Sequence, residues 1–233
     1  MEPLRCFIGF EPREADAYAV AAASLRRHAS RSVEVKPIVL ADMRARGLYA
    51  RPTDKRNGQL WDVISDAPMS TEFALTRFLV PELAGWKGWA LFCDCDFLFR
   101  ADVAEVFDCA HESLAVMVVP HFHVPSEAVK MDGQKQTNYT RKNWSSFMLF
   151  NAGHLAHAGQ IDRVHRWPGL WLHQFRWLQP GDIGALPVRW NWLEGVSDSR
   201  IEPSAVHYTR GVPSMAGFEN AAFADEWRTY ARR

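Results

Sequence analysis

The sequence predicts an α/β fold in which a central sheet, mostly parallel but mixed, is flanked by helices. A short apolar strand over residues 6–10, an amphipathic helix over 15–28 and a second strand over 33–40 make a β-α-β opening. Such a unit implies two parallel strands joined by a right-handed crossover. An apolar run over 89–92 then leads into two aspartates separated by one residue. Parallel sheets bind ligands beyond the carboxyl ends of their strands, so we expect the functional site at this edge.

Composition fits one compact domain and excludes some classes of function. The chain has 233 residues, with 27 Lys and Arg against 27 Asp and Glu, which argues against a nucleic-acid partner. It has neither a signal-like apolar core at its start nor an apolar run of the ~20 residues that cross a bilayer. The spacing of Cys6, Cys93, Cys95 and Cys109 fits free thiols rather than a zinc site or a disulfide. We therefore expect a cytoplasmic protein.

The middle of the chain is expected to contain one irregular stretch and one helix. Residues 42–70 are rich in Arg, Asp, Gly and Pro, which predicts an excursion with little regular structure. A helix is expected from about residue 70 until Pro81, with its apolar side chains inward and Arg77 on a different face. Arg77 would then be available to a ligand, or would form a salt bridge on the helix surface.

The second half is expected to alternate strands with short helices. A basic stretch with few aliphatic residues, which includes Lys130, Lys135 and Arg141, predicts a mobile loop over 121–143 that selects substrates. The remaining expectations are a helix over 103–107, strands over 114–119, 147–150 and 205–208, a turn over 151–153 and an extended segment over 186–191.

The C-terminal segment carries Phe223, Trp227 and Tyr230 at helical spacing, with arginines nearby. A helix of this pattern either docks its aromatic face on the core or lies on an anionic membrane surface. Peripheral contact with the inner face of the cell membrane therefore stays open at this point.

Asp94 and Asp96 form a candidate metal site. Side chains alternate along an extended chain, so both carboxylates leave one face about 7 Å apart along the backbone. Mg2+ and Mn2+ prefer oxygen ligands and keep positions open for substrate phosphates. Two like charges directly after a buried strand need a compensating cation, although two acidic residues on a solvated loop would look the same. Other histidines, among them His121, His154 and His157, fit surface or core groups better than metal ligands.

The motifs together resemble a known family. The β-α-β opening, Arg77-Phe78-Leu79-Val80-Pro81, Asp94-Cys95-Asp96 and His207-Tyr208-Thr209-Arg210-Gly211 resemble the nucleotide-sugar-dependent glycosyltransferases of the GT-A fold. Glycosyltransferase family 8 and related bacterial enzymes look nearest, and the resemblance covers residues 7–211. It implies a single GT-A-like domain over 1–233, with a nucleotide-binding half at about 1–100, an acceptor half at about 101–211 and a tail over 212–233.

The resemblance also implies roles for individual residues. Asp94, Asp96 and His207 would hold Mn2+ or Mg2+ against the donor diphosphate. Asp94, Asp96 and Gln174 would be catalytic. The implied donor-binding residues are Gly9, Phe10, Glu11, Arg13, Arg77, Asn143, Asn151, Arg210 and Gly211.

The chain departs from the family pattern at three places. The family's Phe-Asn-Ser-Gly is displaced or missing in the segment that runs from Asn143 to Asn151. Of an Asp-Gln-Asp stretch only Gln174 survives. A lysine that follows the late histidine motif is absent, and Arg210 or a loop lysine would replace it. The identity of the donor sugar is therefore not fixed by the resemblance.

The leading hypothesis is a metal-dependent glycosyltransferase of polysaccharide biosynthesis. It would move a hexose, with retention, from a UDP-linked donor to a saccharide or glycoconjugate acceptor. One alternative is an inactive protein that keeps the fold and binds sugar nucleotides. The other is an Asp-x-Asp phosphatase or phosphotransferase, but that class carries its motif on the first strand and this chain carries it centrally. The sequence does not indicate an oligomeric state.

Overall fold

The computed structural model describes residues 2–121 and 141–231, and a mixed six-stranded sheet forms the centre of this part of the chain. The strand order is β10-β8-β9-β6-β1-β2. All strands run in one direction except β9, which is antiparallel to both of its neighbours. The predicted mostly parallel, mixed sheet is therefore confirmed. The bounds are β1 Leu4–Gly9, β2 Val33–Ile38, β6 Trp89–Cys93, β8 Val116–Val118, β9 Phe147–Asn151 and β10 Ile183–Ala185.

The β-α-β opening forms as the sequence predicts. A 3-10 turn, η1 (Pro12–Glu14), leads from β1 into α1 (Ala15–His28), and β2 returns parallel to β1. α1 buries small side chains, Ala17, Ala21 and Ala22, so that it can lie close to its neighbours.

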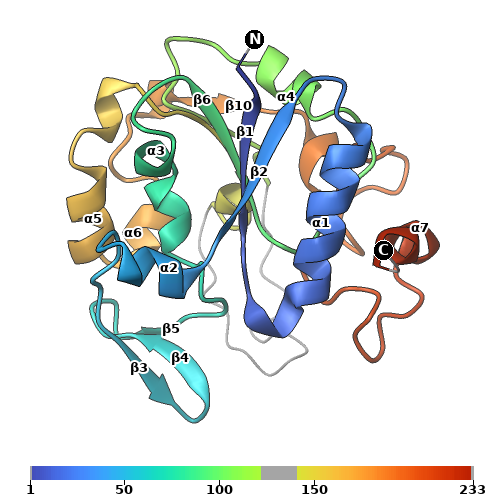
Figure 1. Cartoon of the computed structure of the whole chain (residues 1–233), viewed down its shortest axis with the longest axis horizontal. Coiled ribbons are helices and arrows are strands. Elements are labelled where there is room, and N and C mark those ends of the chain that lie inside the picture. Colours follow the sequence, from blue (N-terminus) through green and yellow to red (C-terminus); the bar gives the residue numbers. More distant parts are fainter. Residues whose placement is uncertain (1, 122–140, 232–233) are drawn as a thin grey trace.

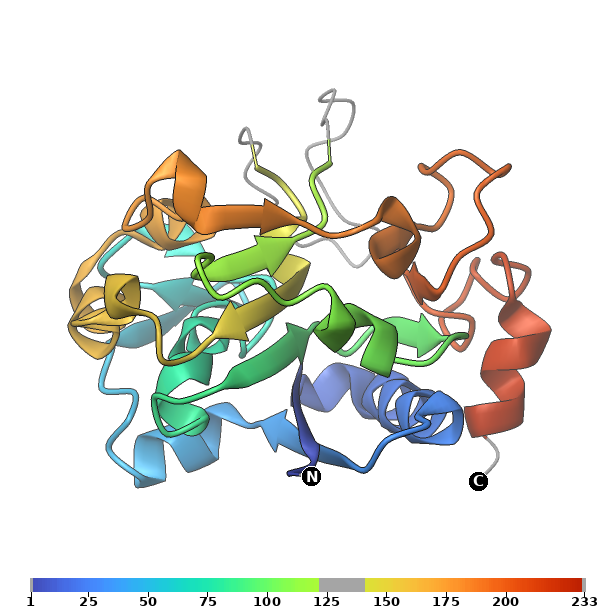
Figure 2. The ribbon, with the colours of Figure 1, turned by 90° about the horizontal axis from the view of Figure 1, so that it is seen from above.

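Helices lie on both sides of the sheet. α1 and α7 (Ala224–Ala231) cover one side, whereas α3 (Val80–Leu83), α5 (Gln160–Arg166) and α6 (Gly169–His173) cover the other (Figures 1 and 2). The remaining helical elements are α2 Leu40–Ala45, α4 Ala104–Asp108, η2 Thr76–Leu79, η3 Trp144–Ser146, η4 Leu155–His157, η5 Pro180–Asp182 and η6 Val188–Asn191.

A second sheet extends the core beside the metal motif. β7 (Phe97–Phe99) follows the two aspartates directly and pairs antiparallel with β12 (Ala205–His207), which is parallel to β11 (Trp192–Leu193). His207 therefore pairs with Phe97, one residue after Asp96. This pairing brings the late histidine motif to the end of β6.

Residues 42–70 are more regular than predicted. They contain a three-stranded antiparallel sheet of β3 (Thr53–Arg56), β4 (Gln59–Asp62) and β5 (Ala67–Pro68), which projects from the molecule in Figure 1. The buried side chain of Arg51 ties this sheet to the helical layer: it binds both carboxylate oxygens of Asp62 and the carbonyls of Val164 and Trp167. The prediction of little regular structure in residues 42–70 was therefore wrong. The sequence alone does not distinguish a buried, paired arginine from an exposed arginine in a loop.

Two other expectations need correction. The segment before Pro81 consists of turns and η2 rather than one helix, and Pro81 lies inside α3, because proline is tolerated in the first turn of a helix. Residues 188–191 form the 3-10 helix η6, not an extended segment. The predicted basic loop falls mainly on residues 122–140, including Lys130 and Lys135, and so lies outside the described residues.

The C-terminal helix docks on the core. Trp227 is 2% exposed in a cluster with Ala17 and Val20 of α1, and the hydroxyl of Tyr230 contacts His28 Nε2 at 3.2 Å. The aromatic side chains Trp227 and Tyr230 of α7 thus pack against α1, as the docking alternative requires. In the described parts of the chain, no helix has the length and apolar character of a membrane span.

Candidate metal and donor site

Asp94, Asp96 and His207 converge at the carboxyl end of β6. Asp94 and Asp96 lie between β6 and β7, and His207 ends β12. Their ligand atoms lie within 4.8 Å of one another, and His207 Nε2 is 3.3 Å from Asp96 Oδ1. Main-chain hydrogen bonds hold both aspartates, because the Asp94 amide donates to the Ser146 carbonyl and the Asp96 carbonyl accepts from the Tyr208 amide. The three residues singled out by sequence are therefore brought together.

Asn191 fixes which nitrogen of His207 faces the aspartates. Asn191 Nδ2 donates to the Asn143 carbonyl at 3.1 Å and to Ser146 Oγ at 3.0 Å. A carbonyl only accepts, so Asn191 Oδ1 must be the atom that lies 2.7 Å from His207 Nδ1. Nδ1 then carries the proton, and in the neutral ring Nε2 presents its lone pair towards Asp96.

The geometry of this triad fits a divalent cation. In the neutral ring, a lone pair that faces a carboxylate oxygen at 3.3 Å in a buried place is repulsive unless a positive charge lies between them, either a bound cation or a proton on Nε2. Two carboxylates and one imidazole match the ligands that Mn2+ and Mg2+ accept, and a hydrogen bond to the far nitrogen of the histidine is the usual support of such a ligand. Asp94, Asp96 and His207 are thus the residues that could hold the metal.

Arg77 is paired rather than available. Its guanidinium lies 2.8 Å from Asp94 Oδ1 and donates to the Ser145 carbonyl at 2.8 Å, and the residue is 6% exposed. The guanidinium also lies over the rings of Phe73 and Phe92. Arg77 therefore positions Asp94. The salt bridge of the second alternative forms, but inside the site rather than on the helix surface, because η2 directs the side chain inward. A donor-binding role of Arg77 stays a prediction.

The turn before β9 supports several site groups at once. Asn143 has the left-handed backbone φ of 64°, which aims its carbonyl at both Ser146 Oγ and Asn191 Nδ2. Ser145 Oγ contacts His173 Nδ1 at 2.7 Å. Because β9 runs against its neighbours, the residues before it lie at the same edge as those after β6. Asn143 is thus placed beside the triad through its backbone.

The predicted donor-binding residues of the first strand lie at the same edge. Ile8 pairs with Cys93, so Gly9 adjoins the start of the metal motif. Gly9 also has a packing role, because a Cβ there would meet the Phe73 ring at 2.4 Å. Glu11, 2% exposed, accepts from Arg13 Nε and from the Glu72 amide, while Phe10 packs edge-to-face against Tyr18.

Two other predicted residues follow β12. Arg210 pairs with Glu194 at 2.9 Å and its side chain is 45% exposed, and Gly211 is packed against Phe218. The Gln174 carbonyl accepts from Arg141 and its Oε1 accepts from Arg176 Nε. Gln174 follows His173, which contacts the turn before β9, so it borders the site.

Asn151 is not brought to the site. It pairs with Trp89, at the start of β6, and its amide donates to the Glu112 carbonyl. The rest of β6 separates it from the metal motif, so it lies at the opposite edge of the sheet. The resemblance implied a donor-binding residue here, but β9 is antiparallel to β6, so Asn151 at its end lies away from the metal motif.

Sequence reasoning missed four polar residues of the site, Asn191, Ser145, Ser146 and His173. Burial, with Arg77 beside it, lowers the pKa of His173 to about 3, so the ring is neutral at pH 7. His121 also lies here: burial, followed by the neighbouring His207, lowers its pKa to about 4. Asn191 ends the segment 186–191, which was expected only to be extended, and neither it nor the serines were identified from the sequence as site residues.

Comparison with known proteins gives one relative with high sequence identity. Protein CDI from Arabidopsis thaliana is 43% identical over 232 residues, which cover 97% of this chain and 85% of that protein. No protein-family model matches the chain, so membership of glycosyltransferase family 8 stays a prediction.

Solved glycosyltransferases share the fold. The bifunctional glycosyltransferase WbbM superposes with a TM-score of 0.67 at 15% identity over 98% of this chain, which spans about half (49%) of WbbM. The galactosyltransferase LgtC, solved with donor and acceptor sugar analogs, superposes at 0.59 and 13% identity over 98% of this chain and 95% of its own. GlyE from Streptococcus pneumoniae gives 0.58 and 13% over 100% of this chain and 61% of its own. The chain therefore has the GT-A glycosyltransferase fold.

Proposed function

The chain belongs to the family of Protein CDI from Arabidopsis thaliana, and from the GT-A fold and the candidate metal site we propose that it is a metal-dependent glycosyltransferase. It transfers a hexose, with retention, from a UDP-linked sugar to a saccharide or glycoconjugate acceptor. The donor nucleotide binds the half formed by residues 1–100, and residues 101–211 bind the acceptor.

One observation carries this proposal. Asn191 fixes His207 Nδ1 as a donor, which leaves Nε2, 3.3 Å from Asp96 Oδ1, as the atom that can offer a lone pair to a cation shared with the aspartates. A loop with two solvated aspartates needs no such support, and neither does a phosphatase that uses aspartate as a nucleophile. A cation bound by Asp94, Asp96 and His207 would supply Lewis-acid stabilisation of the charge that develops on the leaving diphosphate.

The residues of the chain prepare this site in distinct ways. Arg77 holds Asp94 in place and compensates its charge before any ligand binds. Asn191 orients His207 and keeps the proton on Nδ1. Glu11 holds Arg13 at the end of β1, where the side chain of Arg13 is 50% exposed and can reach the donor nucleotide. Gln174, which borders the site, contacts the substrate during transfer.

Hydrolysis of the donor tests the proposal. The protein is incubated with a panel of nucleotide sugars, with and without Mn2+, and released nucleoside diphosphate is measured. We expect Mn2+-dependent release of UDP from one donor, and its loss in Asp96→Asn. Asp225→Asn, which changes an exposed aspartate of α7, is the control and should behave as the unchanged protein.

Other outcomes identify the alternatives. If the protein binds UDP but releases no nucleoside diphosphate from any donor, it is an inactive sugar-nucleotide-binding protein. Release of phosphate from phosphomonoesters, with nucleotide sugars left intact, would indicate a phosphatase. Equal release by Asp96→Asn and the unchanged protein would reject the metal-dependent mechanism.

A further inference from the structure

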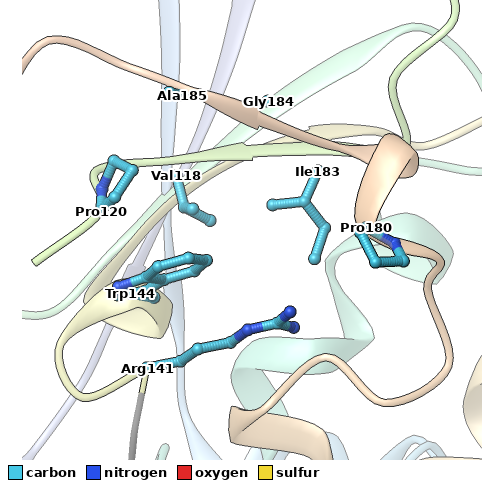
Figure 3. A pocket seen from close by; sticks show the side chains of 8 residues that line it. All are labelled: Val118, Pro120, Arg141, Trp144, Pro180, Ile183, Gly184 and Ala185. Atoms are coloured by element: carbon cyan, nitrogen blue, oxygen red, sulfur yellow. The ribbon is translucent and has the colours of Figure 1, made fainter.

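A pocket opens at the carboxyl end of β8 and along β10. Figure 3 shows Val118 and Ile183 on one side, Pro180 at one end, and Trp144 and Arg141 on the other side. Its volume is about 210 Å³. Sites for drug-sized ligands measure ~300–1,000 Å³, so this pocket suits a single small ring rather than a long chain.

The pocket combines an aromatic face with one positive charge. The guanidinium of Arg141 lies 5.2 Å from the centre of the Trp144 ring and points across the pocket towards Ile183 (Figure 3). One of its nitrogens donates to the Gln174 carbonyl at 2.6 Å, which fixes the side chain. A guanidinium has five N–H donors, so several stay available to a ligand.

No carboxylate of the described residues compensates Arg141. The other residues that line the pocket contribute apolar side chains or the backbone of β10. Arg141 forms no ion pair with another described residue. Many other arginines of this part do pair with acidic side chains, among them Arg77 and Arg51. A guanidinium that no carboxylate of residues 2–121 and 141–231 pairs, set against apolar walls, is a ready partner for an anion, which it can bind through two parallel hydrogen bonds.

The pocket shares a wall with the metal site. The wall is the segment 141–146, in which Trp144 and Arg141 face the pocket, whereas the Ser146 carbonyl binds the Asp94 amide. The Asn143 carbonyl of the same segment holds Asn191, the support of His207. A ring in the pocket would therefore lie next to the place where a donor loses its sugar.

We propose that this pocket binds an anionic sugar ring of the acceptor, stacked on Trp144 with its acidic group on Arg141. This inference rests on the proposed function, because it names the acceptor class of that same reaction. Arg141 is the residue that sets specificity: it favours an acidic ring over a neutral one. The flat face of Trp144 supplies apolar contact that any pyranose shares.

Ligand-observed NMR tests the pocket separately from catalysis. Saturation transfer to D-glucuronate, D-glucose 6-phosphate and D-glucose is measured on the protein loaded with UDP and Mg2+, which is diamagnetic and leaves the sugar resonances sharp. We expect the signal of at least one anionic sugar to exceed that of glucose about fivefold or more. In Arg141→Gln the preference should vanish, and in Arg141→Lys, which keeps the charge without the planar fork, it should be reduced. The two anions distinguish a carboxylate from a phosphate as the recognised group.

A matched variant controls for loss of charge. Arg56→Gln also removes a guanidinium that stacks on a tryptophan, Trp61, but on the β3–β4 hairpin, and should keep the preference. Equal signals for charged and neutral sugars, or a preference that survives in Arg141→Gln, would overturn the acceptor proposal. Calorimetry of UDP with Mn2+ separates failure of the pocket assignment from failure of the proposed function. If UDP binds but the protein does not discriminate between the sugars, only the pocket assignment fails. If UDP does not bind, the proposed function is contradicted.

Discussion

Replacing Asn191 by leucine should weaken the metal site without touching a metal ligand. Asn191→Leu removes the hydrogen bond to His207 Nδ1 and the two donated to Asn143 and Ser146. His207 is then free to rotate and to place its proton on Nε2, towards the aspartates. Loss of such a supporting hydrogen bond costs about 10–100-fold in metal affinity.

The same change also destabilises the fold by an amount that can be worked out. Three buried hydrogen bonds at ~1 kcal/mol each give a loss of about 3 kcal/mol, part of which the leucine recovers by burying apolar surface. Asn191 is 0% exposed, so no water replaces the lost partners. The free energy of unfolding, from a urea titration, should fall by about 2–3 kcal/mol and leave a folded protein at 25 °C.

The assay is calorimetry of Mn2+ in the presence of UDP, at pH 7.5. Asn151→Leu is the matched control, since Asn151 donates one hydrogen bond, to Glu112, at the opposite edge of the sheet. Its Mn2+ affinity should equal that of the unchanged protein. An Asn191→Leu protein that is folded and still binds Mn2+ within about twofold of this control would refute the supporting role of Asn191, because the expected loss is at least tenfold.

Three further predictions concern stability. Arg51→Leu should lower the free energy of unfolding by ~3–5 kcal/mol, because it leaves Asp62 buried without its partner. Adding Asp62→Leu to this variant should restore much of the loss. If urea titrations show that the losses of the two changes add, the two residues do not act as a buried pair. Gly9→Ala should cost ~1–3 kcal/mol through overpacking against Phe73, and an unchanged urea midpoint would show that the ring moves freely. Burial lowers the pKa of His157 to about 4. Below pH 6.5 the unfolded chain therefore binds a proton at His157, whereas the folded chain does not until the pH nears 4. The free energy of unfolding should thus be highest above pH 6.5 and fall as the pH drops towards 4, by ~2 kcal/mol at pH 5. His157→Gln should flatten this pH dependence in thermal unfolding, and equal slopes for the variant and the unchanged protein would argue against it.

The predictable parts of the fold are those that local pattern controls. The helix over 15–28 follows from apolar spacing, and its bounds match those of α1. The two aspartates were predictable as a metal site because they follow a strongly apolar strand, whereas the metal role of His207 was implied by the family resemblance alone. The direction of β9 was not predictable in this way, because an apolar strand buried on both faces carries no mark of its orientation, and Asn151 was misplaced for that reason.

The supporting residues were harder to predict than the ligands. Asn191 and Ser146 act through a hydrogen bond whose partners lie 45 positions apart, whereas a serine or asparagine near a turn commonly bonds to the backbone of that same turn. Arg77 was identified, but its pairing with Asp94 depends on how η2 turns the side chain, which a helical pattern over the whole segment hides.

The segment 141–146 has a thermodynamic consequence. Arg141 and Trp144 line the pocket, while Asn143, Ser145 and Ser146 hold Asn191, Arg77 and Asp94. When a ligand on one side orders this segment, the segment has less conformational entropy left to lose when a second ligand binds on the other side. Linkage then requires reciprocity: if Mn2+ and UDP tighten the binding of a sugar in the pocket by some factor, the sugar tightens theirs by the same factor. This short stretch of backbone would thus make donor and acceptor bind cooperatively, without a moving domain.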